Sequence, residues 1–204
     1  MTSDASWPST RLSLILRIRS ESDDEAWNTF VDLYVPLIYR YCRKRGLQDA
    51  DAQDVSQDVC TNVCRGIRTF EYDPARGKFR GWLGKITAHA IYHAVGKARA
   101  AGLGIGGDDT DITLDNLESS EDPQWIETFN LHIYQQGLER TRVHFSPEVW
   151  HAFELVWVQD GEPKAVALQL QQKPDWVYRA KFKVLQKLRE EIEYLASDSP
   201  MLMK

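Results

Sequence analysis

Residues 49–67 read DADAQDVSQDVCTNVCRGI, and two patterns overlap in this stretch. Branched apolar side chains recur every four residues, at Val55, Val59, Val63 and Ile67. This spacing predicts a helix with one apolar face packed against a core. Carboxylates and amides occupy positions off that face, at Asp51, Asp54, Gln57 and Asp58. Such an acidic face either solvates an exposed helix or suits a basic partner surface.

The segment that follows, YDPARGKFRGWLGKITAHAIYHAVGKARA at residues 72–100, is basic and aromatic. Residues 76–107 carry six Lys and Arg residues and no acid, whereas residues 108–122 carry seven acids and no base. The Asp-Pro pair and the glycine after it predict a loop. A helix is predicted to resume at FRGWL, with Trp82, Ile86 and Ala90 facing inward.

Almost every other segment has the periodicity of a helix, and we find no plausible pair of strands. Residues 102–123 mix glycine, acids and small polar side chains, which predicts a flexible linker rather than core. The sequence therefore predicts an all-α protein of two small helical domains joined by an acidic tether. In the second domain, SPEVWHAFELVWV predicts a helix with Trp150, Phe153 and Trp157 on one face.

Residues 161–195 predict a short helix, a tight turn and a longer helix, the layout of a helix-turn-helix. The inner face of the longer helix is predicted to be Val177, Val184, Leu188 and Leu195. Residues 173–189 hold six bases and one acid, and Gln171 occupies the place of a turn glycine. Candidate DNA contacts are Lys173, Trp176, Tyr178, Arg179, Phe182 and Lys183. A merely solvated basic helix would show the same composition.

The composition is that of a soluble globular protein, with 204 residues, 43% hydrophobic, 27% charged and a formal charge of −5. Three cysteines and no secretory signal argue against a disulfide framework. Because no apolar run approaches the roughly 20 residues that a membrane helix needs, we expect a cytoplasmic protein without membrane insertion. Residues 1–21 are expected to be an amphipathic helix or arm.

No phosphate-binding loop, nucleophile elbow or zinc-protease spacing is present, so we expect neither catalysis nor a cofactor. Cys60 and Cys64 are four residues apart, as are His89 and His93, and a zinc site could be drawn from these four. Both cysteines also lie next to the apolar stripe, where they would be small core residues. We favour the second interpretation and expect no metal.

The chain resembles a bacterial extracytoplasmic-function sigma factor of the sigma-70 family. Three features carry the resemblance together: the acidic linker, the C-terminal helix-turn-helix and the stretch DADAQDVSQDVCTNVCRGIRTFEYDPARGKFRGWLGKIT. These proteins are small promoter-recognition subunits of RNA polymerase. The resemblance covers about residues 22–196. It implies region 2 at 22–101, the linker at 102–123, region 4 at 124–196 and a tail at 197–204.

The resemblance implies three sets of contacts. Asp51, Asp54, Gln57 and Asp58 would dock on core RNA polymerase. The minus-ten promoter element and its opened non-template strand would be bound by Tyr72, Arg76, Lys78, Phe79, Arg80, Lys85, His89 and Tyr92, since melting needs rings for bases and charge for the backbone. Trp82 is expected to be core rather than a base-stacking ring. The minus-thirty-five element, as double-stranded promoter DNA, would be read by the helix-turn-helix.

This chain departs from the family in one respect, because His89 stands where the family usually has asparagine. An anti-sigma factor is a further possible partner. Two other functions stay open at this point. One is a helix-turn-helix regulator that binds DNA without polymerase, and the other is an all-helical module that binds acidic proteins.

Overall fold

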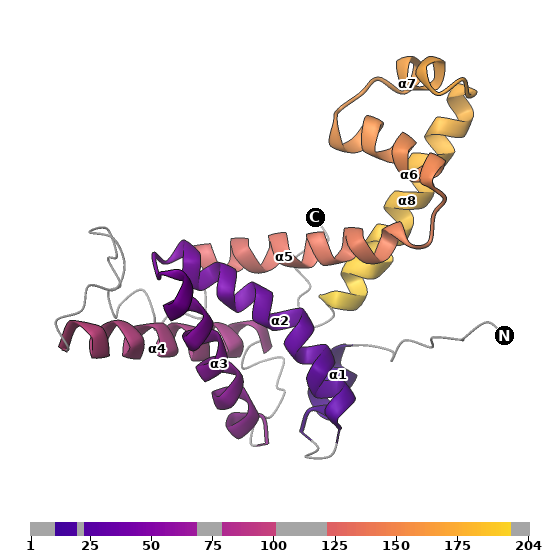
Figure 1. Cartoon of the computed structure of the whole chain (residues 1–204). Helices are drawn as coiled ribbons and strands as arrows, with labels where there is room; N and C mark the ends of the chain where they lie inside the picture. Colours follow the sequence, from indigo (N-terminus) through magenta and orange to yellow (C-terminus); the bar gives the residue numbers. More distant parts are fainter. Residues whose placement is uncertain (1–10, 20–22, 69–78, 101–121, 197–204) are drawn as a thin grey trace. The chain divides into compact units, whose positions relative to one another are not determined.

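The computed structural model describes residues 11–19, 23–68, 79–100 and 122–196, and within these ranges all regular structure is helical (Figure 1), which confirms the predicted all-α class. The α-helices are α1 (Arg11–Arg17), α2 (Asp24–Lys44), α3 (Asp49–Gly66), α4 (Phe79–Ala100), α5 (Pro123–Arg142), α6 (Pro147–Phe153), α7 (Pro163–Gln169) and α8 (Pro174–Leu195). A π-helical turn, η2 (Glu154–Val158), continues α6. The chain divides into two compact units within α5, between His132 and Ile133.

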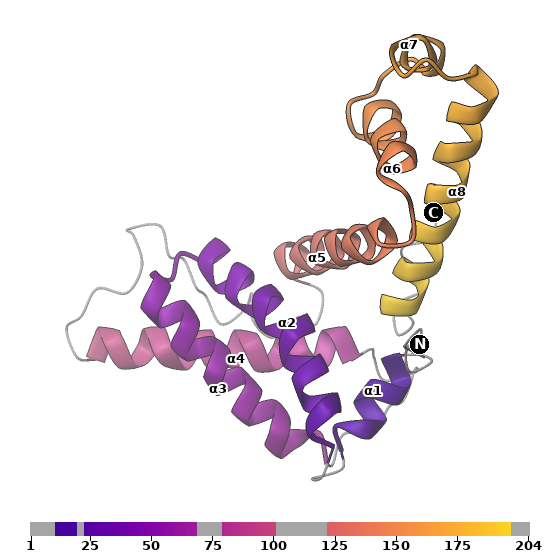
Figure 2. The same ribbon diagram turned by 45° about the vertical axis from the view of Figure 1, so that its right-hand side comes forward.

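In the first unit, α3 packs against both α2 and α4 (Figure 2). The predicted stripe of α3 is confirmed, because Val55, Val59, Val63 and Ile67 are all buried. The rings of Phe30 and Tyr34 on α2 meet the ring of Phe79 at the start of α4, with centroids 6.2 Å and 5.5 Å from it. This aromatic cluster therefore fixes where α4 begins.

The inward face predicted for α4 is confirmed at Ala90, which is buried, but the helix also buries positions outside that face. Its buried side chains include Leu83, Ile91 and Val95, whereas Trp82 and Ile86 are only half-buried. The prediction assumed a single neighbour. In the folded unit α4 packs on α3 and also receives the indole of Trp125 from α5, so a wider and rotated arc is covered.

The first half of α5 belongs to the first unit. The buried Trp125 donates a hydrogen bond from Nε1 to the carbonyl of Arg80 at 3.1 Å. Nε2 of the buried His132 is 2.6 Å from the carbonyl oxygen of Leu33. Asp122 accepts from the backbone N–H of Gln124 at 2.8 Å. The end of the predicted linker, residues 122–123, is thus part of an ordered helix start, and the remainder lies outside the described residues.

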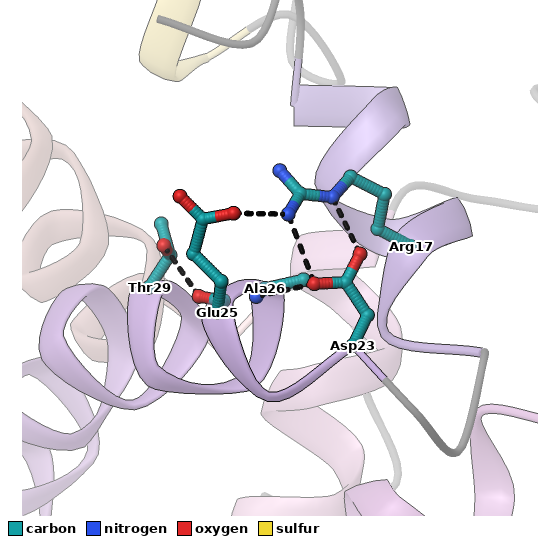
Figure 3. A network of polar contacts seen from close by, with 5 residues as sticks. All are labelled: Arg17, Asp23, Glu25, Ala26 and Thr29. Carbon is teal, nitrogen blue, oxygen red and sulfur yellow. Dashed lines mark hydrogen bonds and ion pairs between the residues drawn. The ribbon is translucent and has the colours of Figure 1, made fainter. Parts of the chain in front are cut away.

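Helix α1 is tied to α2 by charge and by apolar packing. The guanidinium of Arg17 donates to Asp23 at 2.7 Å and to Glu25 at 2.9 Å (Figure 3). Asp23 also caps α2, since its carboxylate accepts from the backbone N–H of Ala26 at 2.9 Å. The hydrogen bonds from Arg17 and then from Ala26 lower the pKa of Asp23, because they favour its charged form.

In the second unit, α8 packs against α6 and α7, and the close approach of Gly137 to Ile192 brings in the second half of α5. The predicted inner face of α8 is confirmed by the burial of Val177, Val184, Leu188 and Leu195. Gln171 has φ of 53°, so the left-handed turn expected at this position is also confirmed. Pro174 occupies the first turn of α8, where its missing N–H costs nothing.

The prediction that Trp157 shares a buried face with Trp150 and Phe153 is wrong. Phe153 is fully buried, but Trp157 is exposed. Val156 is buried in a different cluster, with Val166 and Val177. The reason is the π-turn of η2, in which the N–H of Gln159 bonds to the carbonyl of Glu154, five residues earlier, at 3.0 Å. Because α6 ends at Phe153, the 3.6-residue periodicity used for the prediction does not extend to Trp157.

Two glycines of α4 provide a test of the packing of α5 on the first unit. A Cβ on Gly84 would lie 2.7 Å from Nε1 of Trp125, whereas a Cβ on Gly96 would meet nothing within 4 Å. Gly96→Ala is expected to raise the free energy of unfolding by about 0.5–1 kcal/mol, the helix-propensity gain. Gly84→Ala has the same propensity gain but is expected to destabilise, because the indole must move. Urea unfolding of both variants measures this, and equal stabilisation by the two would contradict the packing.

Candidate functional site

The acidic face predicted on α3 lies on the outside of the first unit. Asp54, Gln57 and Asp58 are exposed and Asp51 is half-exposed. Val55 and Val59, which alternate with these residues in the sequence, are buried. The helix geometry therefore points the acids away from the core. The four residues thus form one continuous surface, which we call the α3 face.

An apolar groove of about 510 Å³ borders this face. Its lining residues come from α2 and α3 and are Val31, Val35, Pro36, Tyr39, Gln53, Ser56, Gln57 and Cys60. Gln57 belongs both to the groove and to the α3 face. From α2, Val31 contributes an apolar side chain that is 39% exposed.

The two cysteines of α3 are half-buried rather than part of the core. Both line a second groove of about 550 Å³, which shares Val31 and Cys60 with the first. Burial raises the pKa of the Cys60 thiol, so this group stays protonated at neutral pH and is a poor metal ligand or nucleophile.

The alternative zinc set is not assembled in the described part of the chain. His89 and His93 are exposed on α4, whereas Cys60 and Cys64 face the grooves on α3. Among the described residues no three His, Cys, Asp or Glu side chains gather in a way that could hold a metal ion.

The residues predicted to bind the minus-ten element divide into three groups: those outside the described residues, those exposed on α4, and the buried Phe79 and Arg80. Tyr72, Arg76 and Lys78 lie outside the described residues. Lys85, His89 and Tyr92 are exposed on α4. Their spacing of four and three residues puts them on one face of the helix. This α4 face offers a cation, an imidazole and a phenol along about two helical turns.

The expectation that Phe79 and Arg80 contact DNA is corrected by the structure. Phe79 is 0% exposed and Arg80 is 8% exposed. The guanidinium of Arg80 lies 5.6 Å from the ring centroid of Phe129, and its carbonyl accepts from Trp125. Both are core residues, because the FRGWL sequence forms the first turn of α4, which is covered by α2 and α5.

Trp82 packs on the same cluster, as expected for a residue that supports the core. Its ring centroid lies 5.4 Å from that of Phe79, and its Cζ2 is 3.2 Å from where a Cβ on Gly66 would be. Trp82 thus closes the end of α3 against α4.

On α8 the predicted contacts are mostly exposed. Lys173, Tyr178, Arg179, Phe182 and Lys183 are on the open side of the helix. Trp176 is different, because it is half-buried and packs against the cluster of Val156, Val166, Ala167 and Val177. Sequence reasoning also missed that Nζ of Lys181 lies 5.0 Å from the ring centroid of Trp157, a cation–π contact that joins α8 to η2.

Comparison with known families now adds to this geometry. Residues 30–101 match the family described as Sigma-70 region 2. The matched range contains the α3 face, the groove beside it and the α4 face. Comparison with curated proteins gives no match. Among the described helices, none combines the length and the hydropathy needed to cross a bilayer.

Two aromatic residues that were both predicted to touch DNA are expected to differ sharply in their effect on stability. Phe79→Ala removes a fully buried ring and should lower the free energy of unfolding by about 3–5 kcal/mol. Phe182→Ala removes a ring that is 68% exposed and should change it by less than about 0.5 kcal/mol. Denaturant unfolding of each variant gives the comparison, and a neutral Phe79→Ala would contradict the assignment of Phe79 to the core.

Proposed function

We propose that the chain is a sigma factor of the sigma-70 family, of the extracytoplasmic-function type. The proposal starts from the match of residues 30–101 to Sigma-70 region 2. A sigma-70 region 2 implies binding to RNA polymerase for promoter recognition, and the family is not enzymatic. In this proposal the chain directs core RNA polymerase in the cytoplasm to promoters with two elements and helps to open the DNA.

Docking to core RNA polymerase is assigned to the α3 face, and this face is the observation that carries the proposal. Asp51, Asp54, Gln57 and Asp58 lie within the matched range and point outward from a helix whose other side is core. The adjoining groove adds apolar lining from Val31 and other residues. A partner helix with basic and apolar side chains could satisfy both, with charge steering the encounter and apolar burial adding affinity. An anti-sigma factor would compete for the same surface.

Binding of the minus-ten element is assigned to the α4 face, Lys85, His89 and Tyr92, together with Tyr72, Arg76 and Lys78. An exposed cation and rings suit an unpaired strand, because the phosphates need charge and the unstacked bases need a flat partner. Phe79 and Arg80 have a supporting role in this proposal, since they anchor the first turn of α4.

Binding of the minus-thirty-five element is assigned to α8, the second helix of a helix-turn-helix formed with α7. The exposed Tyr178, Arg179, Phe182 and Lys183 support this, as does the left-handed turn at Gln171. Residues 22–101 then act as region 2 and 124–196 as region 4, after an arm at 1–21 and ahead of a tail at 197–204. The acidic linker at 102–123 would join them, with its last residues fixed at the start of α5.

Asp54→Arg is expected to abolish binding to core RNA polymerase, because it puts a cation on the surface assigned to a basic partner. Pull-down of core polymerase by the tagged full-length chain measures this. Glu193→Arg makes the same charge change on an exposed acid of α8 for which no role is proposed, and it should bind like the wild type. If wild type and both variants bind equally, the docking surface lies elsewhere. If none binds while another sigma factor does, the chain acts as a DNA-binding regulator on its own.

Arg179→Ala is expected to weaken recognition of the upstream element by about 1–3 kcal/mol and to relax the preference at one base pair, the cost of losing a bidentate arginine–guanine contact. Competition binding with the polymerase complex on matched and mismatched promoters measures both effects. An equal loss on every sequence would instead identify Arg179 as a phosphate contact.

A further inference from the structure

Two aromatic side chains on α8 are exposed, and neither is needed to pack the core of its unit. Phe182 is 68% exposed and Tyr178 is 50% exposed. From this pair we infer that α8 reads thymine, through apolar contact between the Phe182 ring and the C5-methyl group in the major groove, with Tyr178 beside it. The inference rests on the proposed function of α8 and adds the class of base that it recognises.

The pair lies on the side of α8 that faces away from its own unit. Tyr178 and Phe182 are four residues apart and therefore share one face of the helix. Val177, Ala180 and Val184 are the buried side of this part of α8. Val177 packs with Val156 and Val166, and Val184 packs with Trp150 and Phe153. Figure 2 shows α6 and α7 beside α8. Neither ring belongs to the two apolar clusters of this unit. The pair is thus available to a ligand without any rearrangement of the fold.

The chemistry of the major groove restricts what a phenylalanine can read there. Its side chain has no donor or acceptor, so it cannot distinguish the polar edges of guanine, adenine or cytosine by hydrogen bonding. Thymine alone presents an apolar group in this groove, its C5-methyl. Contact between that methyl and the exposed ring removes apolar surface of both from water, which is favourable. A thymine is therefore the base that gains most from Phe182.

The charged neighbours of the pair divide the remaining work. Arg179 and Lys183 are exposed next to it, one residue after each ring, and can reach guanine or the phosphates. Lys181 is held over the ring of Trp157 at 5.0 Å on the flank of α8, so it does not cover the aromatic pair. The face therefore offers an apolar centre with cations at its edge, which suits a groove floor bordered by phosphates.

The experiment removes the methyl group and nothing else. The full-length chain with core RNA polymerase first selects promoters from random DNA, and each thymine of the enriched upstream element is then replaced by deoxyuridine. At one thymine or more, wild-type binding should weaken about fourfold, the effect of one buried methyl group. Phe182→Ala should bind thymine and deoxyuridine templates equally, and Phe182→Leu should keep part of the discrimination.

Arg179→Ala is the matched control, because it lies on the same helix and should keep the thymine–deoxyuridine difference while losing its own base preference. An enriched element without thymine overturns the inference. So does a thymine–deoxyuridine difference that Phe182→Ala leaves intact, or a Phe182→Ala defect in polymerase binding alone. Failure to enrich any upstream element overturns the proposed role of α8 itself, which is a separate and recognisable result.

Discussion

The structure of the first unit depends on the burial of one stripe of α3, formed by Val55, Val59, Val63 and Ile67, against α2 and α4. A helix has a single rotational phase, so burial of this stripe also decides where every other side chain of α3 points. The α3 face is exposed as a consequence, and Asp54 cannot turn inward without an ionised carboxylate entering an apolar core. The polymerase-docking proposal thus uses a surface that the core itself defines.

The same constraint explains why the FRGWL sequence is misleading when it is interpreted only by residue type. Phenylalanine and arginine beside glycines suggest a nucleic-acid contact, but Phe79 and Arg80 are required to seat the first turn of α4. Once that turn is fixed, the phase of α4 places Lys85 and His89 outside. In the proposed function, the FRGWL motif therefore builds the helix that presents the minus-ten contacts, without making them.

What the sequence could predict is determined by the range of the interactions. The stripes of α3 and α8 and the turn at Gln171 follow from patterns within one helix or its cap, and they were predicted correctly. The docking of Trp125 on Arg80 joins residues 45 apart in the chain, and local periodicity carries no information about it. The prediction for Trp157 was wrong for a different reason. A π-turn changes the number of residues per turn, so the periodicity cannot be extrapolated from Phe153.

The proposed roles of the separate faces also reconcile an acidic chain with the proposed nucleic-acid partner. The formal charge of −5 is an average over surfaces that act separately. Exposed charges more than about 10 Å apart are largely screened at ordinary ionic strength, so a strand bound at the α4 face, as proposed, would respond mainly to the charges closest to it. The DNA binding proposed here needs local cations and exposed rings, and both are exposed on α4 and α8. Net charge thus favours solubility and opposes non-specific association, whereas the buried stripes decide which charges a partner meets.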